Sequence, residues 1–345
     1  MNYKSNMRQF AKLFIPLTIV AILVGTSCKK STETTTTLEY MTGSLEFALP
    51  DFILASSELQ LSVSGITDPT SGLSYKWTTI GFSMDTVKTQ TATINAPSVI
   101  GNYSITVVAS HPDYNSKTLT KSTTVIDPFS ETSFSGVVNG PKSIVDSRDG
   151  KTYYYNTIGE LDWFTSNLNW EGAGTTYKNT SALSYIYGRL YSWTEATGGV
   201  SANTLGGGPK GVCPQGWSVP TESDWENLAK YLNNGSPVVF DNSWPGLGSK
   251  VTVNAKLNSS NIWKYSPNNA QNNLFLWNAL PGGNISDNLS RYLNINQYGF
   301  WWSSTQKDET NGMYRYIYFD SPDFPYNYAN KNYFGASVRC VRSAQ

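Results

Sequence analysis

The amino-acid sequence predicts a protein of two unlike domains, an all-β sandwich over residues 43–127 and an α+β domain over residues 136–345. Three observations carry this prediction. Short β-rich runs separated by turn residues fill the first region and show no helical stripe. Helical patterns occur in the second region, among short strands and many loops. Most of the 11 Trp and 22 Tyr residues also lie in the second region, so the composition changes between the two.

The overall composition favours an exported protein and argues against nucleic-acid binding. Lys and Arg total 25 and Asp and Glu total 25, so there is no basic footprint. Charged residues are 14% beside 14% aromatic residues, 28 Gly and 16 Pro, which is typical of loop-rich proteins outside the cytoplasm. The single histidine, His111, falls in a predicted turn, and its isolation excludes metal sites built on two or three histidines.

The first residues predict export. A basic start, an apolar run over residues 13–24 and three small residues precede Cys28. This stretch resembles a bacterial lipoprotein signal peptide over residues 1–27, which implies cleavage before Cys28, acylation of its thiol and a lipid anchor in a membrane. An ordinary signal that leaves Cys28 free is the alternative. Residues 29–37 are polar and low in complexity, and they predict a flexible tether over residues 28–42.

The sandwich is predicted from alternating runs between turns. In the predicted strand 101–109, one face is apolar and the other carries Ser and Thr. Trp77 is the expected core tryptophan of the facing sheet. Residues 75–77 and 101–107 resemble a PKD-like or bacterial immunoglobulin-like module, which implies a spacer or presentation domain. The predicted strands are 59–63, 74–78, 91–94, 101–109 and 118–125.

The second domain begins with a predicted hairpin over residues 144–155, with Asp149-Gly150 as its turn. A helix is expected over residues 185–196, before two glycines. A second helix is expected from Thr221, because Asp224 stands at the capping-box spacing and an apolar stripe follows. Later strands are expected at 299–305, 314–319 and 336–342.

Cys213 and Cys340 are expected to form a disulfide. If lipid occupies Cys28, these two are the cysteines that remain in the mature chain. The bridge would close a loop of about 127 residues and contribute ~4–5 kcal/mol in the loop-entropy model.

Seven sequence pieces of the second domain, in this order, resemble the FISUMP-type "major paralogous" domain of Bacteroidetes and fibrobacterial lipoproteins. That family is similar to the C-type-lectin-like fold shared with formylglycine-generating enzymes. The resemblance implies a compact α+β fold with two helices, a small twisted sheet and long loops on one side. The pieces lie at 149–150, 187–191, 213–221, 225, 279–283, 301–305 and 337–340.

The sequence predicts a protein without catalytic residues. The second domain has no histidine, its two cysteines suit a structural bridge, and the Glu-Pro-Asn and Trp-Asn-Asp signatures of calcium-dependent lectins are missing. No cofactor is expected, although two loops carry carboxylates that could hold calcium, at 284–287 and 320–323.

Aromatic side chains are the candidate ligand contacts, because an exposed ring is a platform for a sugar. The candidates are Trp263, Trp277, Trp302 and Tyr326. Tyr326 lies within a Tyr-rich region over residues 314–328. Core packing is the competing interpretation for each of them. Trp301 and Trp302 are adjacent and point to opposite faces of a strand, so at most one is expected to face outward.

These observations favour a non-enzymatic, lipid-anchored protein of the outer membrane or cell surface, with the periplasmic face left open. Its loops would bind a glycan or an envelope or host protein. The alternative is a structural component of a fimbrial tip or of envelope assembly, and an enzyme is the least favoured class.

Overall fold

The computed structural model describes residues 37–83, 89–238 and 243–345. The predicted signal peptide and Cys28 lie outside these residues. The chain divides into two units, residues 1–38 and residues 39–345, and the following description concerns the second. Among the described residues, no helix combines the length and the apolar character that crossing a membrane would require.

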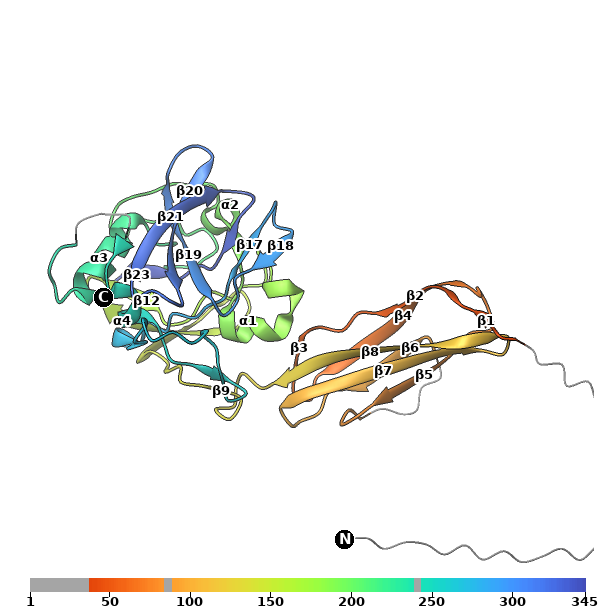
Figure 1. The fold of residues 1–345 in the computed structure, drawn as a ribbon. Coiled ribbons are helices and arrows are strands. Elements are labelled where there is room, and N and C mark those ends of the chain that lie inside the picture. Colours follow the sequence, from red (N-terminus) through yellow and green to blue (C-terminus); the bar gives the residue numbers. More distant parts are fainter. Residues whose placement is uncertain (1–36, 84–88, 239–242) are drawn as a thin grey trace, which may run out of the picture. The chain divides into compact units, whose positions relative to one another are not determined.

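Residues 39–126 form two sheets that share one hydrophobic core. One sheet has the order β1-β8-β7-β5, with β3 also paired to β8, and the other has the order β2-β4-β6 (Figure 1). All five predicted strands are present within longer strands. The strands are β1 Glu39–Tyr40, β2 Thr42–Phe47, β3 Phe52–Leu54, β4 Glu58–Asp68, β5 Ser74–Thr79, β6 Thr91–Asn95, β7 Gly101–His111 and β8 Tyr114–Ile126.

Alternation along β7 explains this core. Ile105, Val107 and Ala109 are fully buried, as the sequence pattern predicts. Trp77 is also buried and packs edge-on against Phe47, with ring centroids 5.3 Å apart.

The predicted tether is too long by a few residues, because Glu39–Tyr40 pairs in parallel with β8 and Thr42 begins β2.

The remainder of the unit contains short sheets and helices. Its helices are α1 Ser181–Tyr187, α2 Trp193–Thr197, α3 Glu222–Leu232 and α4 Leu247–Val251, with 3-10 turns at Tyr177–Asn179 and Leu274–Leu276. Its strands are β9 Phe134–Ser135, β10 Lys142–Val145, β11 Thr152–Ile158, β12 Leu161–Phe164, β13 Tyr191–Ser192, β14 Ser243–Trp244, β15 Lys256–Leu257, β16 Ser260–Asn261, β17 Asn284–Ser286, β18 Arg291–Leu293, β19 Tyr298–Gln306, β20 Asn311–Tyr318, β21 Phe324–Asn330, β22 Gly335–Ala336 and β23 Val341–Ser343.

The helix expected over residues 185–196 is wrong, because the chain forms α1 and α2 with a break between them. Gly188 ends α1 with a φ of 70°, which a residue with a side chain rarely adopts. Ser192 then begins α2 through a capping box with Glu195. The helix expected from Thr221 is confirmed as α3, with the predicted capping box between Thr221 and Asp224.

The strand expected over residues 336–342 is also wrong, since β22 and β23 belong to different sheets. Between them, the Ser337 amide donates to the Phe300 carbonyl at 3.0 Å, and the Cys340 carbonyl accepts from the Phe164 amide at 3.0 Å. This crossing segment therefore links the central hairpin of β19 and β20 to the sheet β10-β11-β12-β23.

A buried guanidinium fixes the crossing segment. Arg339 is fully buried, and its nitrogens donate to the Asn167 side-chain oxygen at 2.8 and 3.1 Å and to the carbonyls of Phe164, Trp277 and Asn278. Its guanidinium also lies 4.0 Å from the centre of the Trp277 ring. Burial lowers the pKa of Arg339 to about 9, so the group remains charged at neutral pH.

The predicted disulfide is confirmed. Cys213 and Cys340 form an S–S bond of 2.05 Å across 127 residues, and both are fully buried. The bond ties the segment before α3 to the crossing segment beside Arg339.

Replacing both cysteines by serine should lower the free energy of unfolding by ~2–5 kcal/mol, because the unfolded chain regains the entropy of a long loop. Chemical denaturation of the Cys213→Ser/Cys340→Ser variant measures this loss. A Cys28→Ser variant is the matched control and should be unchanged. Equal stability of the double variant and the wild type would contradict the assigned role of the disulfide.

Replacing Arg339 by lysine should destabilise the protein by ~2–4 kcal/mol, because three ammonium donors cannot satisfy acceptors arranged around a planar guanidinium. Arg291→Lys is the control, since Arg291 forms an exposed pair with Asp287 and should change stability by less than about 1 kcal/mol. Equal melting temperatures of the two variants would show that the planar group is dispensable.

Candidate functional site

The candidate site lies on the sheet β14-β21-β20-β19. Strands β19 and β20 form a hairpin in which Tyr298 pairs with Tyr318 and Phe300 pairs with Tyr316. Their rings are in contact: the Tyr298 ring lies 4.6 Å from the Tyr318 ring and 5.3 Å from the Phe300 ring, measured between centroids. Tyr298, Tyr316 and Tyr318 are each half-buried, so this wall of rings presents phenol edges to solvent.

A groove of about 580 Å³ runs beside these rings, and we call it the tyrosine groove. Strand β21 supplies Tyr326 and Tyr328, so five tyrosines converge on it. Their phenol groups combine an apolar face with a hydroxyl that donates and accepts. The lining residues are Ser243, Tyr298, Tyr316, Tyr318, Ser321, Asp323, Pro325, Tyr326, Asn327 and Tyr328.

The Asp323 carboxylate of the groove has hydrogen-bonding capacity left. The Asp323 carboxylate accepts from the Gly246 amide at 3.0 Å through one oxygen, Oδ1. The Ser243 hydroxyl is buried and has no hydrogen-bond partner within the described part of the chain. This oxygen is shielded from solvent, so it does not face a ligand in the groove.

A buried ion pair supports the groove from below. Arg315 on β20 pairs with Trp301 on β19 and with Tyr326 on β21. Its guanidinium donates to the Glu222 carboxylate at 2.5 and 3.1 Å. The same guanidinium stacks 3.6 Å from the centre of the Trp244 ring and 5.4 Å from that of Tyr326. Burial raises the pKa of Glu222, and the charge of Arg315 opposes that shift.

The structure buries three of the four predicted ligand contacts. Trp263, Trp277 and Trp302 are 2%, 0% and 0% exposed, so none offers a ring face to a sugar, and their assignment as ligand contacts is corrected here. The indole of Trp302 donates to the Tyr191 carbonyl at 2.7 Å, and that of Trp263 donates to the Ala279 carbonyl at 3.2 Å. The fourth, Tyr326, lies in the tyrosine groove.

Trp302 is buried because the central hairpin of β19 and β20 is covered on both faces. Trp301 belongs to one core cluster and Trp302 to another, and both are fully buried. The two side chains do point to opposite faces, as expected, but neither face is open at this position.

Sequence reasoning missed Tyr298 and Ser243. Tyr298 could have been found from the hairpin, because a turn centred near residue 308 places it directly opposite Tyr318. Ser243 follows a segment of weak pattern, and no sequence signal distinguishes its hydroxyl from those of other loop serines.

The two loops considered for calcium are occupied by protein contacts. One oxygen of Asp320, Oδ1, accepts from Ser266 at 2.5 Å and from Asn268 at 3.0 Å, whereas Asp287 pairs with Arg291 at 3.4 Å. Within residues 37–83, 89–238 and 243–345, no group of three or more acidic, His or Cys side chains could hold a metal.

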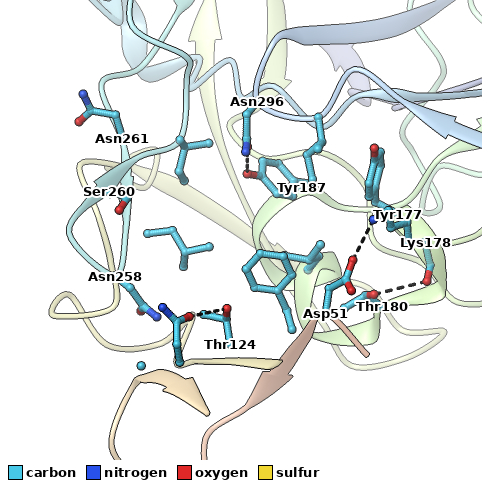
Figure 2. A pocket seen from close by; sticks show the side chains of 17 residues that line it. Asp51, Thr124, Tyr177, Lys178, Thr180, Tyr187, Asn258, Ser260, Asn261 and Asn296 are labelled. Atoms are coloured by element: carbon cyan, nitrogen blue, oxygen red, sulfur yellow. Dashed lines mark hydrogen bonds and ion pairs between the residues drawn. The ribbon is translucent and has the colours of Figure 1, made fainter. Parts of the chain in front are cut away.

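A second cavity, of about 440 Å³, lies where β3, β7 and β8 approach α1 in the unit 39–345. Figure 2 shows Lys178 and Asp51 forming an ion pair at 2.8 Å and the Tyr187 hydroxyl donating to Asn296 at 3.0 Å. Several of its polar side chains bond to each other, and its lining includes the apolar side chains of Phe52 and Leu183.

Comparisons with known proteins give one family match. A family model described as the Fibrobacter succinogenes major domain matches residues 156–342. No curated protein matches the chain. Two solved structures are similar over part of it, each with a TM-score of 0.18, which supports no argument about fold or function. Murine CRIg is 11% identical over 24% of this chain and 96% of its own, and an α-galactosidase candidate from Bacteroides fragilis NCTC 9343 is 17% identical over 30% of this chain and 22% of its own.

Alkaline pH should destabilise the protein through its buried and half-buried tyrosines, and Tyr298 and Tyr316 of the groove should contribute part of this effect. Burial raises the pKa of Tyr298 and Tyr316, while in the unfolded chain their phenols ionise near pH ~10. The folded state then binds more protons, so the free energy of unfolding should fall as pH rises above ~10. Denaturation at a series of pH values should show a shallower fall for Tyr298→Phe/Tyr316→Phe than for the wild type. An unchanged slope would contradict this account, and Tyr333→Phe is the exposed control.

Proposed function

The chain belongs to the Fibrobacter succinogenes major domain family, and on this premise we propose that it is a non-enzymatic envelope protein that binds a glycan in the tyrosine groove. One observation carries the proposal: five tyrosines from three strands converge on a single groove that also holds the Asp323 carboxylate. Sugar rings have apolar C–H faces and polar rims, and tyrosine rings beside amide, hydroxyl and carboxylate groups match both.

The wider organisation is part of the same proposal. A lipid on Cys28 anchors the protein at the outer membrane or cell surface. The two-sheet domain over residues 39–126 acts as an immunoglobulin-like or PKD-like spacer, and the C-terminal domain has a C-type-lectin-like fold. The support is the resemblance of the sequence pieces, the two sheets around one core and the mixture of short sheets and helices closed by a disulfide.

A structural role in envelope assembly is the second candidate. Leu274 and Phe275 are exposed apolar side chains on one turn, and Phe275 has a φ of 63°. The Phe275 carbonyl accepts from the Asn156 side chain at 2.6 Å, which holds this turn in place. Exposed apolar side chains on a strained turn are typical of contacts with another protein.

Replacing Tyr328 by alanine should weaken glycan binding at least about tenfold, equivalent to ~1.4 kcal/mol, because a stacking platform is removed. Tyr333→Ala is the matched control, since Tyr328 and Tyr333 are 49% and 54% exposed and Tyr333 lies outside the groove. The full chain and both variants would be applied to a glycan array, and affinities measured by calorimetry for the glycans that bind.

Equal loss in both variants, or no loss in either, would reject the groove as the glycan site. If no glycan binds while a Leu274→Ser/Phe275→Ser variant loses a co-purifying envelope protein, the structural role replaces the proposed function.

A further inference from the structure

We propose that the tyrosine groove is selective for neutral glycans, and that the carboxylate of Asp323 excludes acidic ones. This inference rests on the proposed function of the groove as a glycan site. Among the ten described residues that line the groove, Asp323 carries the formal charge at neutral pH, and none is Lys, Arg or His. Proteins bind carboxylate and sulfate groups mainly through Arg and Lys, so the groove lacks the side chains that an acidic sugar needs.

The nearest guanidinium cannot compensate. Arg315 is fully buried beneath the groove and donates to Glu222 at 2.5 Å. Its charge is therefore already neutralised, and its nitrogens do not reach solvent from this position. Moving it toward a ligand would leave the carboxylate of Glu222 buried without its partner, which is strongly unfavourable.

Lys264 and Lys307 are exposed cations near the groove, and neither lines it. The Lys264 ammonium lies 4.8 Å from the centre of the Phe319 ring, which packs 4.6 Å from the Tyr318 ring. The Lys307 ammonium lies 5.8 Å from the centre of the Tyr328 ring. Tyr328 is five residues from Asp323 along an extended chain, a separation of about 16 Å. This separation exceeds the screening length of ~8 Å at physiological ionic strength. Lys307 therefore does not offset the negative charge at the Asp323 end of the groove.

The free hydrogen-bonding groups also favour a neutral ligand. An ionised carboxylate offers about four acceptor positions, and the amide of Gly246 uses one oxygen of Asp323. The remaining positions require donors, which sugar hydroxyls supply and an ionised sugar carboxylate does not.

The experiment uses glycans that contain uronic acids, printed both as free acids and as methyl esters, so that the two members of each pair differ only at one carboxyl group, in its charge and its ester methyl. The full wild-type chain should bind the ester at least about tenfold more tightly than the acid. Asp323→Asn keeps an oxygen for the Gly246 amide, and it should raise binding of the acid at least about tenfold while leaving the ester within about twofold. Asp323→Lys should reverse the preference.

Two further measurements separate selectivity from folding. Asp287→Asn removes an exposed acidic group outside the groove and should leave the ratio of ester to acid unchanged. Raising the salt concentration from about 0.01 to about 1 M shortens the screening length from ~30 to ~3 Å, and it should narrow the discrimination of the wild type.

The outcomes are distinct. Wild-type binding of acids as tight as that of esters, or a ratio that Asp323→Asn leaves unchanged, overturns the selectivity and leaves glycan binding standing. Absence of binding to every neutral and acidic glycan overturns the proposed function, and the selectivity falls with it. Binding of a proline-rich peptide in place of any glycan would identify the groove as a peptide site and overturn both.

Discussion

The buried guanidinium of Arg339 is the interaction on which the C-terminal domain depends. It joins the carbonyls of Phe164, Trp277 and Asn278, which come from segments more than 100 residues apart, and it has Asn167 as a further partner. Asn167 in turn accepts from the Trp301 indole at 2.8 Å. A charge this deeply buried is stable only when all its donors are satisfied, so the surrounding segments must adopt one arrangement.

That arrangement positions the candidate site indirectly. The Trp301 indole packs 5.0 Å from the Trp277 ring, and Trp301 pairs in the sheet with Arg315. Arg315 then supports Tyr326 at the groove. The path from the core to the groove therefore consists of packed rings and guanidinium groups. In the proposed function, a site that is already formed loses less conformational entropy on binding.

Local signals in the sequence predicted the elements well, and long-range packing limited the rest. The capping residues Thr221 and Asp224 and the alternation in β7 depend on neighbours in the chain, so both were readable. The burial of Trp302 depends on Tyr191, 111 residues away. The tyrosine-rich region was recognised, but Tyr298 and Ser243 join it only through strand pairing and loop position, which a single sequence does not specify.

Covering both faces of the central hairpin separates the framework of the domain from its proposed recognition surface. Side chains that hold the fold, such as Trp301 and Trp302, are fully buried, whereas Tyr328 and Asn327 contribute mainly to the rim. Mutations at the rim can therefore accumulate without disturbing the interior. A few substitutions in β21 could therefore change the preference of the proposed site, while the two cysteines and Arg339 keep the fold in place.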